Sequence, residues 1–576
     1  MFLSSLLALA LLAESPAQAS CSLELLAAPV ALPGDTIDIE WTSTGSHSQV
    51  YVSAFSDWGQ QYYLDEITAN DGAHSWTLPP DLDHRSEVHL YIESAEAGAR
   101  TTECWQYQAV DVAHAVDFGF AMDSLADVTQ NRTAYDDAIA EVTQSGPTAD
   151  NGLPSVTINQ IASTGWASGS GLLPTSTVAP HLADLLRDTN LMVGLADIPF
   201  SPADAGCTAL PGGLPGDIYT ESSLDLLRSQ RSGAHQYRVG FPPVFDSTMC
   251  PDAFDSGAYS DWVEEVAADI DASNPVGDVS WETGNEPDGV YFFWGAAGAY
   301  QDKASAAELG IRRVDPTSRI TYGGFGASTV LDMGKVGVST GNDWDDFRDT
   351  LADTPDESLS FHLFRNPGYG PYNGGTFEKS WEDLASAPWP VTDADHVVLS
   401  AFDLFGRNGT DTWKAALENS SWLTYELAEL LFFAHERDID AIYLWKLLDI
   451  DSEGQSGFFD ECGVPRRSYD LLVDVWEVVE DGYVATRDAQ GLVEIRGLNG
   501  LVLEASADQA IAHTSDMDIQ SCWVDDLTES LPSGAVGGEL TTTWGSMDWV
   551  IYAEVSPGAG QACPSVVPVP TPTTCQ

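Results

Sequence analysis

Apolar and polar residues alternate along the first part of the chain, with the period of two that half-buried β-strands show. The alternation is faultless over residues 36–41 and 87–92, and turn formers such as Pro33-Gly34-Asp35 separate the runs. Strands of this kind bury one face each. The pattern therefore predicts a small β-sandwich over residues 20–112.

The period changes in the middle of the chain, where short apolar runs alternate with helical stretches. Residues 261–270 and 422–435 each gather their apolar side chains on one helical face. Repeated strand–helix units predict a central (β/α)8 TIM barrel over residues 113–480, with its sites at the C-terminal ends of the strands. The eight predicted strands cover residues 116–120, 156–161, 191–198, 279–283, 320–324, 359–363, 397–402 and 441–447, and the stretch 237–243 stays an open strand candidate.

Strand-like patterning returns after the barrel. Residues 492–497 and 549–553 are rich in β-branched and aromatic side chains and predict a C-terminal β-domain over residues 481–562. Residues 563–576 are a Pro/Thr-rich tail that cannot build a core, and we expect this tail to be extended or disordered.

The N-terminus has the form of a secretion signal. Residues 2–13 are apolar or small, and Ala17-Gln18-Ala19 has the small-x-small form of a cleavage site. Cys21 allows a lipoprotein as the alternative, although Gln18 occupies the position where a lipobox has Leu. We predict that residues 1–19 are a signal peptide, that the mature protein is secreted or at the cell surface, and that it has no membrane span.

Eight cysteines in an exported chain predict disulfides. Zinc motifs with paired Cys or His at short spacing do not occur, and we predict no cofactor and no metal. Proximity along the chain suggests four pairs: Cys21 with Cys104, Cys207 with Cys250, Cys462 with Cys522, and Cys563 with Cys575.

The charge of the chain is strongly unbalanced. Its 88 acidic and 23 basic residues give a formal net charge of -65. Such a surface repels nucleic acids and anionic membranes, so neither is expected as a partner. The repulsion within the chain needs screening by salt, and this favours solvation in a saline habitat as the role of the acidic surface.

One acidic stretch allows a different reading. Asp449, Asp451 and Glu453, followed by Gly454 and ending at Asp460, loosely follow the spacing of a calcium-binding loop. Calcium binding at this loop is a minor alternative.

The most informative motif is Trp281-Glu282-Thr283-Gly284-Asn285-Glu286-Pro287-Asp288. It follows the apolar stretch 275–280, so a strand ends in an Asn-Glu-Pro corner that places Glu286 at the rim of a sheet. A carboxyl group in such a position is a candidate proton donor. The alternative is an ordinary turn, because Asn, Pro and Asp are common turn formers.

Several further motifs follow this one in a fixed order. Together they resemble the family 39 glycoside hydrolases of clan A, the group of β-xylosidases and α-L-iduronidases, over most of the predicted barrel. The matching residues are Asp188-Thr189-Asn190-Leu191, Pro199-Phe200-Ser201-Pro202, Trp281-Glu282, Asn285-Glu286-Pro287-Asp288, Phe293-Trp294, Val314-Asp315-Pro316, Tyr322-Gly323-Gly324, Ser360-Phe361-His362, Tyr443-Leu444-Trp445, Gly457-Phe458-Phe459-Asp460 and Pro465-Arg466-Arg467-Ser468-Tyr469.

The N-terminal β-sandwich has its own resemblance. It is similar to the Ig-like module of cell-wall proteins rich in Ser and Thr. The similarity lies in the order of three segments: Pro33-Gly34-Asp35-Thr36, the strand with Trp41, and the later Tyr91-Ile92-Glu93-Ser94. Such modules often serve as spacers, and the sequence assigns no site to this one.

The family resemblance implies a role for each matching residue of the barrel. Glu286 would be the general acid/base, Asn285 would bind a sugar hydroxyl, and Glu282 would orient this corner. His362 and Trp445 can equally be core residues, whereas a buried structural role suits Glu286 less well, because an isolated buried carboxylate is costly. The other implied substrate contacts are His362, which lines the sugar pocket, and Trp294 and Trp445, which offer aromatic faces.

The family pattern breaks at the second carboxyl group. Retaining glycosidases need a nucleophile about 5 to 5.5 Å from the acid, yet Ala401 stands in its place and Phe364 replaces a Tyr that would contact it. Asp403, two residues later on the same strand face and about 6.5 Å away, could act as the base of an inverting mechanism. Loss of hydrolysis, and a carboxyl group supplied by another loop, are the alternatives.

The sequence thus predicts a secreted glycoside hydrolase that acts on O-glycosidic bonds of a poly- or oligosaccharide, with Glu286 and Asp403 as catalytic residues. The competing prediction is a catalytically inactive carbohydrate-binding or cell-wall-associated protein, which Ala401 favours. The sugar, the linkage and the oligomeric state do not follow from spacing.

The charge imbalance generates a first prediction. Raising NaCl from about 0.1 M to about 1 M shortens the screening length from about 10 Å to about 3 Å, so the unfolding temperature at pH 7 should rise by several degrees. At the isoelectric point of about 4.1 the same salt step should leave it nearly unchanged. Scanning calorimetry at both pH values measures this, and an equal rise at both would show that salt acts through something other than net charge.

Overall fold

The computed structural model divides into two compact units. One unit comprises residues 1–115, 481–484 and 496–500, and the other comprises residues 116–480, 485–495 and 501–576. The finer five-part division predicted from the sequence stays a prediction. The structure describes residues 22–26, 30–44, 47–56, 61–83, 87–122, 125–149, 151–158, 175–193, 237–240, 256–273, 279–283, 297–326, 358–364, 396–403, 422–449, 457–506, 512–514, 518–524, 539–541 and 548–555.

The first unit contains two β-sheets that share one core. The smaller sheet has the order β1 (Ser22–Leu26), β3 (Thr36–Thr44) and β6 (Ala73–Thr77). The larger sheet has the order β2 (Val30–Ala31), β8 (Ala99–Val112), β7 (Glu87–Glu96), β4 (Gln49–Ser56) and β5 (Gln61–Ala69). Two sheets on one core form a β-sandwich. The prediction of a sandwich is therefore confirmed in this coarse form, and its Ig-like type remains a prediction.

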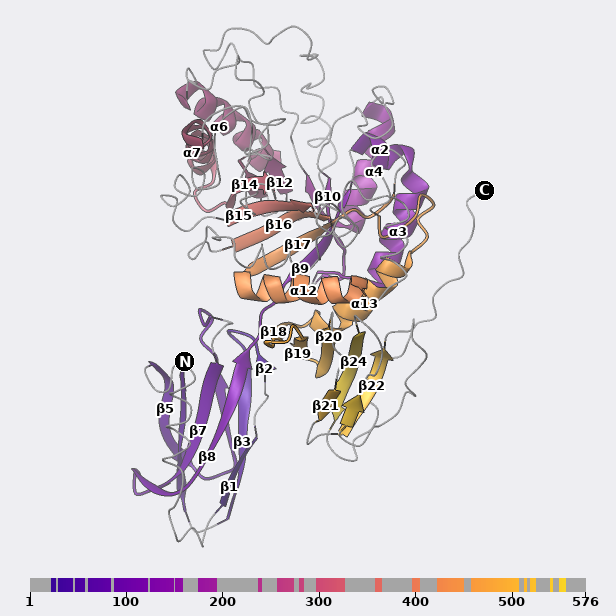
Figure 1. The fold of residues 1–576 in the computed structure, drawn as a ribbon. Coiled ribbons are helices and arrows are strands. Elements are labelled where there is room, and N and C mark those ends of the chain that lie inside the picture. Colours follow the sequence, from indigo (N-terminus) through magenta and orange to yellow (C-terminus); the bar gives the residue numbers. More distant parts are fainter. Residues whose placement is uncertain are drawn as a thin grey trace. The chain divides into compact units, whose positions relative to one another are not determined.

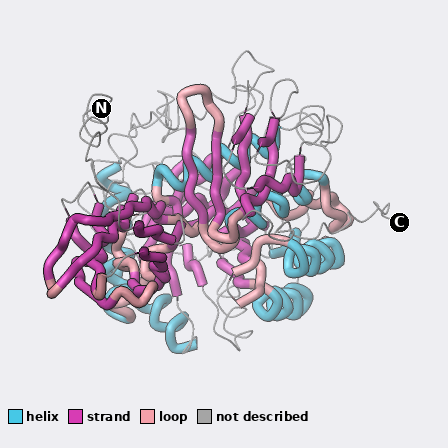
Figure 2. The backbone as a smooth tube through the Cα atoms, turned by 90° about the horizontal axis from the view of Figure 1, so that it is seen from below, coloured by secondary structure: helices cyan, strands magenta, loops and turns pink. Residues whose placement is uncertain are grey.

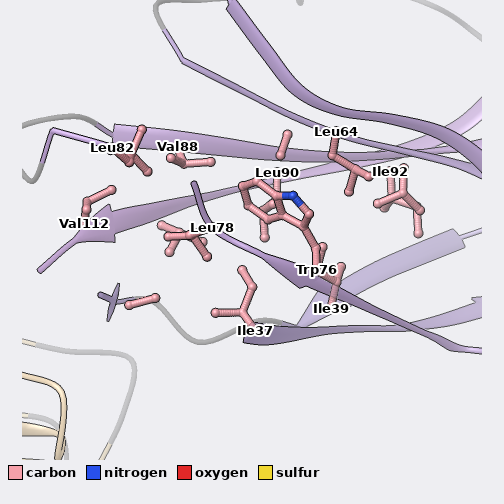
Figure 3. Close-up of a cluster of buried hydrophobic side chains, with 14 of the residues drawn as sticks. Ile37, Ile39, Leu64, Trp76, Leu78, Leu82, Val88, Leu90, Ile92 and Val112 are labelled. Carbon is pink, nitrogen blue, oxygen red and sulfur yellow. The ribbon is translucent and has the colours of Figure 1, made fainter. Parts of the chain in front are cut away.

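Alternating apolar side chains from both sheets fill this core. Ile37, Ile39 and Trp41 of β3 are buried while their neighbours in the strand are exposed, as the sequence predicts. The indole of Trp76 lies among aliphatic side chains from the opposite sheet (Figure 3). Strand β7 differs, because both of its faces are largely buried.

A sheet of parallel strands forms the centre of the second unit. Its strands pair in parallel in the order β11, β10, β9, β17, β16, β15, β14, β13, β12, and the backbones of β11 and β12, at the two ends of this order, also come close to each other. The sheet therefore curls, as in a barrel. Its strands are β9 (Asp117–Met122), β10 (Ser155–Ile158), β11 (Asn190–Val193), β12 (Tyr237–Gly240), β13 (Val279–Glu282), β14 (Ile320–Gly326), β15 (Ser358–Phe364), β16 (His396–Asp403) and β17 (Ile439–Trp445) (Figure 1).

The predicted count of eight strands is wrong for the described part of the chain, where the sheet has nine. The additional strand is β12, which pairs with β13 from Tyr237↔Val279 to Gly240↔Glu282. β12 is only four residues long and carries Arg238, so it lacks the apolar run by which the other strands were recognised. As a consequence, Glu282 stands on the fifth strand of the series and not on the fourth.

Strand β9 carries large side chains on its outer face and a glycine on its inner face. On β9, Phe118 and Phe120 point to the outer face, where Phe118 contacts Trp476 of a helix with ring centroids 5.7 Å apart. Gly119 lies on the inner face opposite Tyr443 of β17. A Cβ atom on Gly119 would come within 2.5 Å of the Tyr443 ring and 2.7 Å of the Ser155 carbonyl oxygen. Glycine is thus required here so that the tyrosine ring can fill the inside of the sheet.

Helices cover the outer face. Both helices predicted in detail are confirmed: residues 261–270 lie in α6 (Ser256–Ser273) and residues 422–435 in α12 (Trp422–Arg437). α6 and α7 lie side by side (Figure 1), and Figure 2 draws the helices of the chain in cyan. α12 is buried on nearly all sides, because it lies between strand β17, helix α13 and strands that follow the barrel. The other helices are α2 (Leu125–Gln130), α3 (Arg132–Ser145), α4 (Thr175–Asp188), α7 (Ala297–Val314) and α13 (Arg467–Val479).

Strands return after α13, as predicted. Residues 493–497 and 548–555 form two members of a five-stranded sheet. Its order is β18 (Tyr483–Arg487), β19 (Val493–Gly497), β20 (Leu501–Ser506), β24 (Asp548–Val555) and β22 (Asp518–Val524), and β21 (Ala512–Thr514) pairs separately with β23 (Glu539–Thr541).

Three further sequence predictions concern the two ends of the chain, the cysteines and the membrane. The signal peptide (residues 1–19) and the Pro/Thr-rich tail (residues 563–576) lie outside the described residues. Cys462 takes part in a disulfide bond, and the four predicted pairings stay predictions. None of the described helices is both long enough and apolar enough to cross a membrane.

The close approach at Gly119 generates a second prediction. Gly119→Ala should lower the free energy of unfolding by about 1–3 kcal/mol, because the added methyl group meets the Tyr443 ring and a backbone oxygen that cannot both move away. Urea unfolding of the variant measures the loss. Gly500→Ala is the control. Gly500 has a φ of 82°, and an added methyl group there would meet no atom within 4 Å. Any loss of stability in this control therefore reflects the backbone conformation alone. If adding Tyr443→Ala leaves the cost of Gly119→Ala unchanged, the ring contact is not its cause.

Candidate functional site

The predicted site residues divide into three groups. Glu286, Asn285 and Trp294 lie outside the described residues. Asp403 is described in its backbone, as the last residue of β16. The side chains of Glu282, His362 and Trp445 are described, and all three stand at or near the C-terminal ends of their strands, β13, β15 and β17.

Strand register places several of these residues on one face of the sheet. His362 of β15 pairs with Gly326 of β14 and with Ala401 of β16. Directly paired residues of neighbouring strands share a face, as do residues two apart in one strand. Ser360 and His362 therefore share the inner face, together with Ala401.

A hydrogen bond ties Glu282 to the same face. The hydroxyl group of Ser360 donates to Oε1 of Glu282 over 2.5 Å, although β14 lies between the two strands. The residue of β14 that pairs with Ser360 is Gly323, which has no side chain and adopts a φ of 118°. The absence of a side chain at Gly323 leaves the space through which Ser360 and Glu282 meet.

The group is well shielded from water. Glu282 is 8% exposed, His362 is 7% exposed and Ser360 is fully buried. A carboxylate at such a depth is stable only when hydrogen-bond donors satisfy it, and a short bond from a hydroxyl group is among the stronger kinds. Glu282 is therefore held in one position, which suits a residue that orients the corner after β13 and suits less well one that changes partner during a reaction.

Strand β16 contains a bulge beside this group. Phe361 pairs with Leu399, but the next residue, His362, pairs with Ala401, so Ser400 is the additional residue. Ala401, 2% exposed, thus lies directly opposite His362. The strand continues to Asp403, which pairs with Phe364 and occupies a position on the same face as Ala401.

Trp445 ends the last strand of the parallel sheet. It pairs with Ala121 of β9 and shares the inner face with Tyr443, and its side chain is partly buried. The peptide bond from Trp445 to Lys446 is cis, and Lys446 is fully buried. The backbone then folds back, with the N–H of Phe458 donating to the carbonyl oxygen of Lys446 over 3.1 Å.

The residues of the possible calcium loop have other roles where they are described. Oδ1 of Asp449 accepts the N–H of Gly457 over 2.6 Å, and the same carboxylate forms an ion pair with Arg466. Oδ1 of Asp460 accepts the N–H groups of Cys462 and Val464 over 2.9 and 3.0 Å. Both carboxylates thus already have partners within the protein, and within the described part of the chain no cluster of three metal-ligating side chains occurs. Asp451 and Glu453 lie outside the described residues.

Sequence reasoning missed Ser360 as a member of the site. Ser360 belongs to the motif Ser360-Phe361-His362, and the strand period of two places it on the face of His362. That signal was readable from the sequence. Its bond to Glu282 was not, because 78 residues separate the two and nothing local to either predicts that Gly323 opens the way between them.

Comparison with known proteins gives similarity at the level of solved structures only. No protein-family model matches the chain, and no curated protein matches it. A glucosidase from Croceicoccus marinus is similar with a TM-score of 0.36 and 13% identity, covering 65% of this chain and 92% of the glucosidase. Endo-glycoceramidase II from Rhodococcus sp. is similar with a TM-score of 0.36 and 12% identity, covering 77% of this chain and 98% of the endo-glycoceramidase. A conserved exported protein from Bacteroides fragilis is similar with a TM-score of 0.41 and 10% identity, covering 76% of this chain and 98% of the exported protein. These similarities are too low for residue roles to be transferred.

The bond between Ser360 and Glu282 generates a third prediction. Ser360→Ala should lower the free energy of unfolding at pH 7 by about 1–3 kcal/mol, because the buried carboxylate loses a donor. Urea unfolding at pH 7 measures the loss. Ser358→Ala, which removes another buried hydroxyl group from the same face of β15, is the matched control, and equal losses for the two variants would contradict the role given to Ser360.

Proposed function

We propose that the chain is a secreted glycoside hydrolase that cleaves O-glycosidic bonds of a poly- or oligosaccharide and resembles family 39 of clan A. The observation that carries the proposal is the buried Glu282 carboxylate, held by Ser360 at the C-terminal end of β13. In parallel α/β sheets this end of the strands is where sites are built. This carboxylate lies on the face that also carries His362, and a buried carboxylate is costly without a donor such as Ser360.

Glu286 is the proposed general acid. It follows the fixed Glu282 by four residues, and Asn285 and Pro287 flank it. In this proposal Glu282 positions the corner, while Glu286 protonates the glycosidic oxygen as the bond to the leaving sugar breaks. Asn285 binds a sugar hydroxyl group, and Trp294 and Trp445 offer aromatic faces to the sugar rings.

Asp403 is the proposed general base. A nucleophile at position 401 is excluded by the alanine there, whereas Asp403 stands two residues, about 6.5 Å, farther along the same strand face. The additional length leaves room for a water molecule between Asp403 and the sugar. Carboxyl groups separated in this way favour inversion, in which Asp403 takes a proton from the attacking water.

The second candidate function is sugar binding without hydrolysis. It is favoured by one observation: Ala401, a side chain with no chemistry, lies directly opposite His362. A barrel that had lost its nucleophile and acquired no substitute would retain the orienting residues and bind a glycan without cleaving it.

Activity measurements form the fourth prediction. Wild type should hydrolyse one or more aryl glycosides, and Glu286→Gln and Asp403→Asn should each lower kcat about 100-fold to 10,000-fold, because each removes a proton transfer. An aryl leaving group that departs without protonation should restore much of the activity of Glu286→Gln and none of that of Asp403→Asn. Glu461→Gln, an exposed carboxyl group in the loop before α13, is the control and should leave kcat unchanged.

The outcomes separate the candidates. Absence of turnover by wild type on every aryl glycoside, combined with measurable binding of the sugar, would favour the binding protein over the hydrolase. Product analysis by proton NMR during the first turnovers reports the anomer. A retained anomer, or full activity of Asp403→Asn, would rule out Asp403 as base and require another carboxyl group.

A further inference from the structure

One face of the five-stranded sheet in the first unit is lined by aromatic side chains. On β4, alternate residues Val50, Val52 and Ala54 enter the core, so Tyr51 and Phe55 lie on the opposite face. Strand pairing extends this face across the sheet. Glu93 of β7 pairs with Tyr51 of β4 and with Trp105 of β8, and Tyr91 likewise pairs with Tyr107. We call Tyr51, Phe55, Tyr62, His89, Tyr91, Trp105 and Tyr107 the aromatic face.

The rings form contacts that run across four strands. Phe55 contacts Tyr62 of β5 and His89 of β7, with ring centroids 5.6 and 5.5 Å apart. His89 stacks on Tyr107 at 5.3 Å, and Tyr91 stacks on Trp105 at 6.0 Å. Neighbouring strands lie about 4.8 Å apart, so four strands span about 14 Å, which is wider than a single monosaccharide.

This face is where large apolar side chains remain in contact with water. Among the residues that the structure describes, the large hydrophobic side chains that are exposed are Tyr62 (56%), Trp105 (41%), Ile67 (37%) and Leu309 (51%). Tyr62 and Trp105 belong to the aromatic face, and Ile67 pairs with Tyr51 on the same face. Exposed apolar side chains gathered on one side of a module mark a binding surface, whereas single ones do not.

Polar neighbours fix several of these rings in place. The guanidinium group of Arg100 lies over the ring of Tyr51, 4.2 Å from its centroid, and Nε of Arg100 donates to Glu93 over 2.6 Å. Glu93 is fully buried. The hydroxyl group of Tyr107 and Nδ1 of His89 lie 2.6 Å apart. Rings fixed in this way lose little conformational freedom when a ligand lies on them, which favours binding.

Carboxylates surround the aromatic face and restrict the class of ligand that it can bind. Asp65 pairs with Ser53, and Glu87 pairs with Asp111, so carboxylates of β5, β7 and β8 also lie on this side of the sheet. The positive charge of Arg100 is already matched by Glu93. An acidic rim of this kind repels polyanions such as nucleic acids or acidic polysaccharides. Its carboxylate and phenol oxygens, in contrast, can accept hydrogen bonds from sugar hydroxyl groups.

We propose that the aromatic face of the first unit binds a neutral polysaccharide, whose sugar rings lie on Trp105 and Tyr62 across strands β5, β4, β7 and β8. Pyranose rings present apolar C–H faces to aromatic rings and polar edges to the rim, and this combination of surfaces is what the sheet offers. The site is separate from the barrel and does not depend on hydrolysis there. It attaches the protein to its polymer.

Affinity electrophoresis of the full chain tests this proposal as the fifth prediction. The protein migrates through native gels that contain a neutral β-glucan, a xylan or a mannan, and all variants carry Glu286→Gln so that the polymer is not consumed. At least one polymer should retard the parent protein. Trp105→Ala and Tyr62→Ala should each weaken binding about tenfold, because each removes a ring on which a sugar lies.

Three controls accompany the two variants. Leu309→Ala removes an equally exposed apolar side chain from the other unit and should bind like the parent. Trp105→Phe keeps a ring and should retain most of the binding, whereas Trp105→Leu keeps only apolarity and should lose it.

Several results would overturn the proposal. Unchanged retardation of the Trp105→Ala, Tyr62→Ala double variant would place polymer binding elsewhere in the chain. Failure of all three neutral polymers to retard the parent, or stronger retardation by an acidic polysaccharide, would exclude the proposed ligand class. A dimer in sedimentation velocity that Trp105→Ala dissociates would identify a second copy of the chain as the occupant. None of these results depends on whether the barrel hydrolyses glycosides.

Discussion

The inside of the curled parallel sheet holds large side chains where neighbouring strands carry none at the facing positions. Gly119 illustrates the constraint, because its missing side chain leaves room for the ring of Tyr443. Gly323 likewise has no side chain where the hydroxyl group of Ser360 bonds to Glu282. The outer face lies against helices, with Phe118 packed on Trp476. The same alternation that closes the interior thus fixes the direction in which the candidate site residues point.

The few basic residues of the chain have largely structural partners wherever they are described. Arg466 pairs with Asp449 beside the last strand, and Arg487 contacts the almost fully buried Glu429 of α12 over 3.1 Å. On the helix surfaces, Arg313 contacts both Asp261 and Glu264 over 2.9 Å. A chain with nearly four acidic residues for each basic one therefore uses its cations to hold carboxylates in place. Loss of such an arginine would leave a buried or crowded carboxylate without compensation, which costs more than the pair itself contributes.

Much of the fold could be predicted because its signals are local. The alternation on β3 and the helical period of α12 are properties of single segments, and the strand and the helix both form where the sequence predicts them. Strand β12 was not among the eight predicted strands, because its four residues include Arg238 and form too short an apolar run. The sequence also did not predict that α12 is buried on nearly all sides, because this burial depends on strands that come 60 residues or more later.

The candidate site divides in the same way. The positions of Glu282, His362 and Trp445 near strand ends follow from local pattern. The bond from Ser360 to Glu282 required two strands to meet across a third, and no pattern within either strand encodes that meeting. The aromatic face could not be predicted for a related reason. Its residues come from four strands, and each strand alone contributes only one or two rings.

The bulge at Ser400 shows that a single additional residue decides which residues at the end of β16 face the candidate site. Before the bulge, Leu399 pairs with Phe361 on the outer face; after it, Ala401 and Asp403 occupy the inner face. With strict alternation, positions 400 and 402 would take the inner face, and Asp403 would be turned toward the helices. The insertion or deletion of a single codon in an ancestral strand would therefore exchange which residues of the strand face the inside of the sheet, without altering any residue at its tip. Evolution of such a site can proceed by shifting the register of a strand against its neighbour, and the residues at its tip need not be replaced one by one.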